Sequence, residues 1–160
     1  MPEGVAVVDV RVTLSVDAVV VFFAFRSMSS LSEGLKWEKH THEVLLQLDE
    51  TMILTLNAET ATRGFMISGD ETFLEPYKLA VQRIDQNLAE LKSMISNNPN
   101  QFQRAAELEN TINERMDFLS GRIELRKNNS FEEVTTRFKD NRGRELSDKF
   151  RSLIGQMKTE

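Results

Sequence analysis

The sequence contains no cysteine among its 160 residues. This absence excludes disulfide bonds, thiolate zinc sites, iron–sulfur clusters, thioether-attached haem and a cysteine nucleophile. The chain also has only 7 Gly and 3 Pro, so it offers few turns and must consist of long elements. Lys and Arg total 20 against 25 Asp and Glu, a net charge of −5, so the chain lacks the basic excess that nucleic-acid binding requires. Its 40% hydrophobic content is that of a globular domain.

The N-terminal segment has an ambiguous pattern. Residues 5–25 are mostly Val, Ala and Phe and are long enough for a membrane helix. Each internal charge would cost about 2.5–3.5 kcal/mol at the bilayer centre, and residues 8–18 alternate with the period of a strand. We interpret residues 1–26 as an altered or degraded membrane helix, with a strand-like leader as the alternative, and residues 27–160 as the folded domain. The interrupting charges are Asp9, Arg11 and Asp17.

After residue 26, apolar residues recur every three or four positions, which predicts amphipathic helices. We expect a long first helix over residues 27–67. Gly69 would supply its left-handed end, and Asp70 would cap the next element. A turn over residues 71–75 would then lead to a second helix from Pro76. The expected buried positions of the first helix are Leu31, Leu35, His42, Leu45, Leu48, Met52, Leu56, Glu59, Arg63 and Met66.

Two further helices complete the pattern. Asn98 is expected to cap the third helix, with Pro99 as its first residue. Ser130 and Glu133 have capping-box spacing and would open a fourth helix, whose middle around Gly143 is polar. Four amphipathic helices with short connections predict an all-α, antiparallel up-down-up-down four-helix bundle with a long first helix. The apolar face of the expected second helix consists of Leu74, Tyr77, Val81, Ile84, Leu88, Leu91 and Ile95. That of the third consists of Phe102, Ala105, Leu108, Ile112, Met116, Leu119 and Ile123. That of the fourth consists of Phe131, Val134, Phe138, Leu146, Phe150, Leu153 and Met157.

The histidines do not predict a metal site. His40 and His42 are two residues apart, so on a helix their side chains point about 200° from each other. Neither has a Glu three residues before it, as a di-iron bundle requires. His42 begins a stretch similar to a histidine-kinase phosphoacceptor motif, but residues 45–47 depart from it, so we expect a histidine at the bundle seam. We predict no catalytic residue, no metal and no cofactor.

Glu59 and Arg63 are the strongest candidates for a functional pair. Their spacing and order favour an intrahelical ion pair, and their place on the apolar stripe predicts partial desolvation. The pair would either anchor the end of the helix or recognise an anion or carboxylate, with the Tyr77 hydroxyl nearby. Glu59, Arg63 and Tyr77 are therefore the candidate ligand-binding residues.

Residues 57–70 read NAETATRGFMISGD and are followed by FLEPY at residues 73–77. This long stretch resembles the hallmark of the type-three CHASE family, the sensory extracellular domains associated with cyclases and histidine kinases. Ala61 departs from the glycine that is usual there. The matching residues are Trp37, His40, Thr41, Glu59, Arg63, Gly64, Gly69, Asp70, Leu74, Pro76, Tyr77 and Pro99.

The resemblance implies a periplasmic sensor domain in a bacterial inner-membrane receptor, homodimeric and flanked by membrane helices. Its output would most often be a histidine kinase, otherwise a diguanylate cyclase or chemoreceptor unit, so this chain itself would not be an enzyme. We expect the signal to travel by displacement of the fourth helix, at its polar middle over residues 139–144, against the first. Two other classes of function remain as alternatives. One is a cytoplasmic histidine phosphotransfer bundle that uses His40 or His42, and the other is a ligand-free dimerisation stalk.

Overall fold

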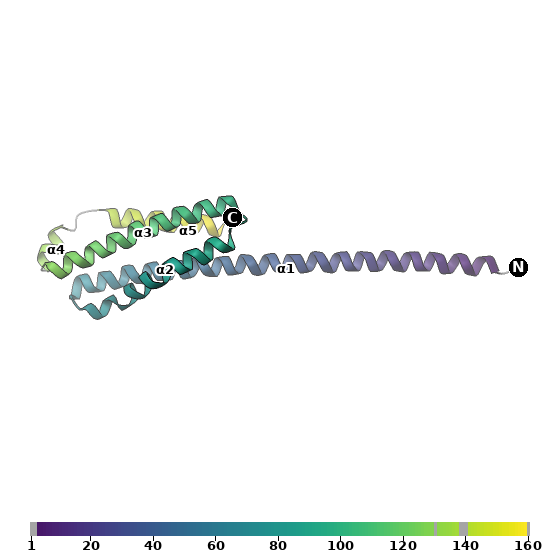
Figure 1. Cartoon of the computed structure of the whole chain (residues 1–160), viewed down its shortest axis with the longest axis horizontal. Coiled ribbons are helices and arrows are strands. Elements are labelled where there is room, and N and C mark those ends of the chain that lie inside the picture. The colour runs from purple at the N-terminus through teal and green to yellow at the C-terminus, as the bar shows by residue number, and fades with distance from the viewer. Residues whose placement is uncertain (1–2, 130, 138–140, 160) are drawn as a thin grey trace. The chain divides into compact units, whose positions relative to one another are not determined.

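A computed structural model describes residues 3–129, 131–137 and 141–159 and shows an all-helical chain (Figure 1). These residues form five α-helices and one 3-10 helix and contain no strand, which confirms the all-α prediction. The expected fourth helix comprises α4 and α5, while Ser130, Phe138 and Lys139 lie outside the described residues. The elements are α1 (Glu3–Ser68), η1 (Glu71–Leu74), α2 (Glu75–Met94), α3 (Pro99–Asn128), α4 (Phe131–Arg137) and α5 (Arg142–Lys158).

The chain divides into two compact units, residues 1–42 and residues 43–160. In the first unit, residues 8–18 are helical, so the alternative of a strand-like leader is wrong. Each residue added to a helix gains a backbone hydrogen bond, so a helix can extend through a short alternating pattern. None of the described helices is long and apolar enough to cross a membrane.

The described side chains of the first unit do not form a core. Leu31 and Leu35 are 67% and 59% exposed, so their predicted burial is wrong. Helical periodicity identifies a helix, but burial also requires a second element to pack against. The exposed large apolar residues of this unit are Val20, Val21, Phe22, Phe23, Phe25, Met28, Leu31, Leu35 and Trp37.

The second unit has an apolar core shared by α2, α3, α5 and the part of α1 after residue 42. Helix-to-helix hydrogen bonds accompany this packing: the Gln101 side chain on α3 donates to the Met157 carbonyl on α5 at 3.3 Å. The core cluster consists of Leu48, Leu54, Ala58, Ala80, Ile84, Leu88, Leu91, Ile95, Ala105, Leu108, Ile112, Leu119, Phe150, Leu153, Ile154 and Met157.

The predicted end of the first helix and the predicted start of the third are confirmed, whereas the first helix begins at Glu3 and not near residue 27. Gly69 has a φ of 74°, in the left-handed region that glycine occupies readily. Asp70 then caps η1 by accepting a hydrogen bond of 2.9 Å from the Thr72 amide. Asn98 caps α3 by accepting from the Gln101 amide at 3.2 Å, with Pro99 in the first turn.

The buried face of α1 differs from the predicted stripe. His42 and Arg63 are exposed, and three threonines are fully buried instead. Threonine can be buried here because each hydroxyl donates to the carbonyl four residues earlier, at 2.8–2.9 Å. A count of apolar residues alone therefore placed the face incorrectly. The threonines are Thr51, Thr55 and Thr62; elsewhere the predicted core positions Val81, Phe102 and Phe131 are exposed.

Candidate functional site

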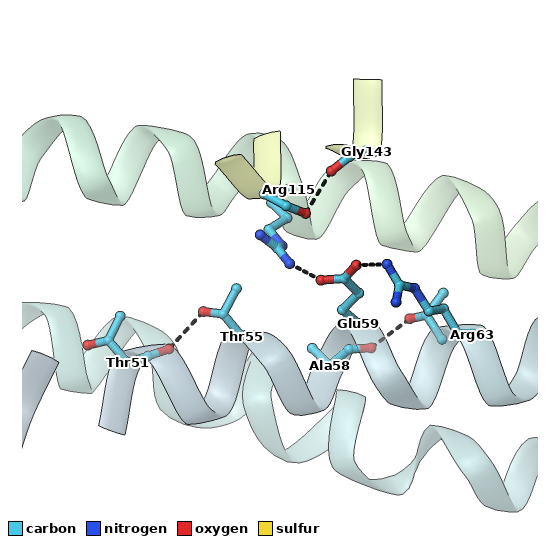
Figure 2. A network of polar contacts seen from close by, with 9 residues as sticks. Thr51, Thr55, Ala58, Glu59, Arg63, Arg115 and Gly143 are labelled. Carbon is cyan, nitrogen blue, oxygen red and sulfur yellow. Dashed lines mark hydrogen bonds and ion pairs between the residues drawn. The ribbon is translucent and has the colours of Figure 1, made fainter. Parts of the chain in front are cut away.

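One carboxylate joins two arginines where α1 packs against α3. Arg63 donates to Oε1 of Glu59, and Arg115 donates to its Oε2 (Figure 2). The predicted Glu59–Arg63 ion pair is therefore confirmed. The predicted desolvation is correct for the Glu59 side chain, which is 14% exposed, but wrong for Arg63, which is 72% exposed. We call Glu59, Arg63 and Arg115 the charged cluster.

Arg115 is the residue of this cluster that the sequence analysis missed. Its side chain is only 2% exposed, and its guanidinium lies 5.3 Å from the ring centre of Phe150. Burial lowers the pKa of Arg115 from its ordinary value, while Glu59 opposes that shift. Its Nη1 is buried and has no hydrogen-bond partner. The sequence contains a signal that could have predicted the burial of Arg115, because residue 115 falls between Ile112 and Leu119 on the buried face of α3.

A second polar site joins α1 to α2. The single hydrogen of the Thr51 hydroxyl can go to Oδ1 of Asn87 or to the Gln47 carbonyl, and the Gln47 side chain donates to the Asn87 carbonyl and to Oε2 of Glu90, both at 3.1 Å. Thr51 is fully buried and Asn87 is 4% exposed. We call Gln47, Thr51 and Asn87 the neutral layer. Its only unsatisfied buried side-chain atom is Nδ2 of Asn87.

The turn after α1 explains two glycines of the hallmark. A Cβ at Gly64 would lie 2.5 Å from the Phe73 ring, and a Cβ at Gly69 would lie 2.7 Å from Nη2 of Arg126. Nε of Arg126 also donates to the Met66 carbonyl at 3.0 Å and so caps the end of α1. Larger side chains would therefore disturb both the turn and the cap.

The comparisons with known proteins support one family. A family model of the CHASE3 domain matches residues 35–160. The chain belongs to the CHASE3 family. CHASE3 domains are extracellular sensory domains of membrane signalling receptors, among them histidine kinases and cyclases. No curated protein and no solved structure matches the chain.

The CHASE3 domain does not bring all three candidate ligand residues together. Tyr77 is half-buried and packs beside Phe65 and Leu74, but it has no hydrogen bond to Glu59 or Arg63, although all three residues are described. Leu74 is buried as predicted. The ligand-binding role of the three residues stays a prediction.

The other residues that match the CHASE3 hallmark differ in their exposure to solvent and in their local contacts. Trp37 is 72% exposed, and its ring stands edge-on to His40 at 6.3 Å. Thr41 and His42 are exposed, so the predicted seam position of His42 is wrong. Pro76 lies in the first turn of α2, where a missing N–H is tolerated. Within the described residues, no group of three His, Asp or Glu could hold a metal ion.

Proposed function

We propose that this CHASE3 domain is the periplasmic sensor of a bacterial inner-membrane receptor whose output is a histidine kinase. A diguanylate cyclase or a chemoreceptor signalling unit is the alternative output. In this proposal the chain binds or responds to a stimulus and carries no catalysis and no cofactor of its own. The sensory role of the family supports it.

The proposed architecture is an antiparallel up-down-up-down bundle of α1, α2, α3 and the α4–α5 pair. Cross-helix contacts support this order. Glu59 meets Arg115 and Met66 meets Arg126, so α1 and α3 advance in the same direction. Gln101, near the start of α3, meets Met157, near the end of α5, as antiparallel helices require.

The buried ion pair between Glu59 and Arg115 is the observation that carries the proposal. A passive stalk gains little from such a pair, because well-packed apolar residues of similar volume are often as stable or more so. We propose that this buried polar contact instead discriminates between alternative packings. A stimulus that favours one packing would shift the population by its differential affinity. We propose that α1 then moves relative to α3 and α5 by about 1–2 Å, as helices do in other switching proteins.

The proposal also includes a homodimeric receptor and flanking membrane helices. Residues 1–26 are proposed as an altered membrane-helix or leader segment of that receptor. Nucleic acid is not a proposed partner, because the chain has a net charge of −5.

Spin-label distances in the full-length receptor test this mechanism. Nitroxides at Ile53 on α1 and Ser152 on α5, both exposed, report the separation of the two helices in membrane vesicles. We expect Glu59→Gln to shift the distance distribution and to change receptor autophosphorylation. The control is Lys78→Gln, at an exposed lysine that pairs with Glu75 on α2, and it should change neither. A folded Glu59→Gln receptor with unchanged distances and unchanged output would contradict the proposal.

The exposed imidazole of His42 favours one competing function, histidine phosphotransfer. That function predicts acid-labile phosphate on the chain after incubation with phosphoramidate, lost in His42→Gln and kept in His40→Gln. Absence of label in the wild-type chain would reject it, and stoichiometric label on His42 would replace the sensor proposal.

A further inference from the structure

The charged cluster has more positive than negative charge. Two guanidinium groups share the single carboxylate of Glu59. A third, on Arg151, is close enough to Arg115 to disfavour its charged form. An excess of arginines around one partly buried carboxylate attracts a second anion, and guanidinium groups bind carboxylates and phosphates through paired hydrogen bonds.

The cluster also has donors that no protein atom uses. Nη1 of Arg115 is buried without a partner, on a side chain that is 2% exposed. A buried unsatisfied donor is costly, more so on a charged group, so an added acceptor would be favourable. Arg63 uses Nη2 for Glu59 and has 72% of its side chain exposed, which leaves the rest of its guanidinium open to solvent.

The carboxylate of Glu59 joins an exposed arginine to a buried one. Arg63 lies at the surface, Arg115 is buried, and Glu59, which is 14% exposed, lies between them (Figure 2). A small oxyanion that binds Arg63 would compete with Glu59, because each has two oxygens that can accept from the guanidinium groups of Arg63 and Arg115. Displacing Glu59 would break its ion pair with Arg115, which is one of the contacts between α1 and α3.

We propose that the charged cluster is the ligand site of this sensor and that its ligand is a small oxyanion, a carboxylate or a phosphate. The anion bridges Arg63 and Arg115 in place of Glu59. This inference rests on the proposed sensor function and names the chemical class of the stimulus. Binding therefore breaks the Glu59–Arg115 contact between α1 and α3 and allows the movement of α1 that the receptor would transmit.

Titrations of the full chain test the site directly. Sodium acetate, sodium phosphate and sodium chloride are added at matched ionic strength, and the arginine side-chain NMR signals are followed. We expect acetate or phosphate to shift the signals of Arg63 and Arg115 with saturation, and chloride to leave them unchanged. Equal shifts with chloride would show charge screening alone and would overturn the site.

Two variants and a matched control sharpen this test. Arg63→Gln removes the surface arginine and should weaken oxyanion binding about ten- to hundredfold, because hydrogen bonds to charged groups contribute about 1.5–3 kcal/mol. Arg144→Gln removes another exposed arginine with an acidic partner four residues away, Asp148, and should leave binding unchanged. Equal losses in the two variants would overturn the proposal.

Glu59→Gln removes the internal competitor while keeping the size of the side chain. Its oxyanion binding should be at least tenfold tighter than that of the wild type, and acetate should raise its thermal unfolding midpoint more. A variant indifferent to acetate and phosphate would overturn the site. If the anions bind the wild type but receptor output never responds to them, the site stands and the sensor function fails. If output responds to another stimulus and no anion binds, the reverse holds.

Discussion

The neutral layer and the charged cluster bury polar groups in the same core by different means. In the neutral layer, Thr51 and Gln47 bond to Asn87 and no group needs a counterion. In the charged cluster, Arg115 is 2% exposed and depends on Glu59, which it shares with Arg63. Uncharged amides and hydroxyls fix the register of two helices at a modest cost in free energy of burial. A buried charge instead makes the stability of the helix packing depend on one contact with its counterion. This difference is the reason why we propose the charged cluster, and not the neutral layer, as the element that switches between two packings.

The largest expected effect is on the charged cluster. Glu59→Gln leaves the Arg115 charge in the core without a counterion, so we expect the free energy of unfolding to fall by about 3–5 kcal/mol. Urea denaturation followed by circular dichroism measures the loss. A loss under about 1 kcal/mol would mean that Arg115 reaches solvent. The charged cluster would then tolerate the loss of a partner as well as the neutral layer does.

A double replacement separates a switch from a stabilising contact. Glu59→Leu combined with Arg115→Met removes both charges and should recover most of the stability lost in Glu59→Gln, because apolar residues of similar volume often replace a buried pair without loss. The same receptor should lose its response to stimulus. Stability that stays as low as in Glu59→Gln would show that the ion pair is mainly structural.

The neutral layer should respond less to mutation. Asn87→Ala removes the Oδ1 acceptor of Thr51, whose hydroxyl can still donate to the Gln47 carbonyl, so the expected loss is about 0.5–1.5 kcal/mol. Replacing both partners, Thr51→Val with Asn87→Leu, should be nearly neutral. Urea denaturation at low and high salt provides the check, and neither variant should change in salt sensitivity. A salt-dependent loss would contradict the uncharged character of this layer.

The sequence predicted the helices and their ends better than it predicted their faces. Gly69, Asp70, Asn98 and Pro99 act locally, through backbone conformation and capping, so their roles follow from neighbouring residues alone. Burial depends on the partner helix. Three threonines are buried on α1 because their hydroxyls donate to main-chain carbonyls of the same helix. A pattern of apolar residues does not include such polar residues and therefore does not predict their burial.

The candidate site was predicted in part for the same reason. The spacing of Glu59 and Arg63 is a property of one helix and predicted their ion pair. Arg115 comes from α3, 56 residues further along the chain, and only the packing of the two helices brings it to Glu59. A charged residue inside an apolar stripe is the sequence signal that would identify such a partner.

A smaller effect is expected at the exposed member of the charged cluster. Arg63 is 72% exposed, so solvent screens its bond to Glu59. Arg63→Gln should lower the free energy of unfolding by only about 0.3–0.5 kcal/mol, and the difference should vanish in 1 M NaCl. Lys78→Gln, at another exposed ion pair, is the matched control and should lose a similar amount. A loss several times larger would place Arg63 with Arg115 in the structural part of the cluster.

The smallest effect concerns the other hallmark carboxylate, Asp70, which is a solvent-exposed counterpart to Glu59. Hydrogen bonds from the Thr72 amide and then its hydroxyl lower the pKa of Asp70 below its ordinary value. Because the folded pKa is the lower one, its contribution to stability is present above the unfolded pKa and is lost as the pH falls through the folded pKa. NMR titration of the carboxyl carbon measures that pKa. Thr72→Val should leave most of the depression, since the amide, which is the larger cause, remains. A return to the ordinary pKa in Thr72→Val would show that the hydroxyl, and not the backbone cap, holds this carboxylate.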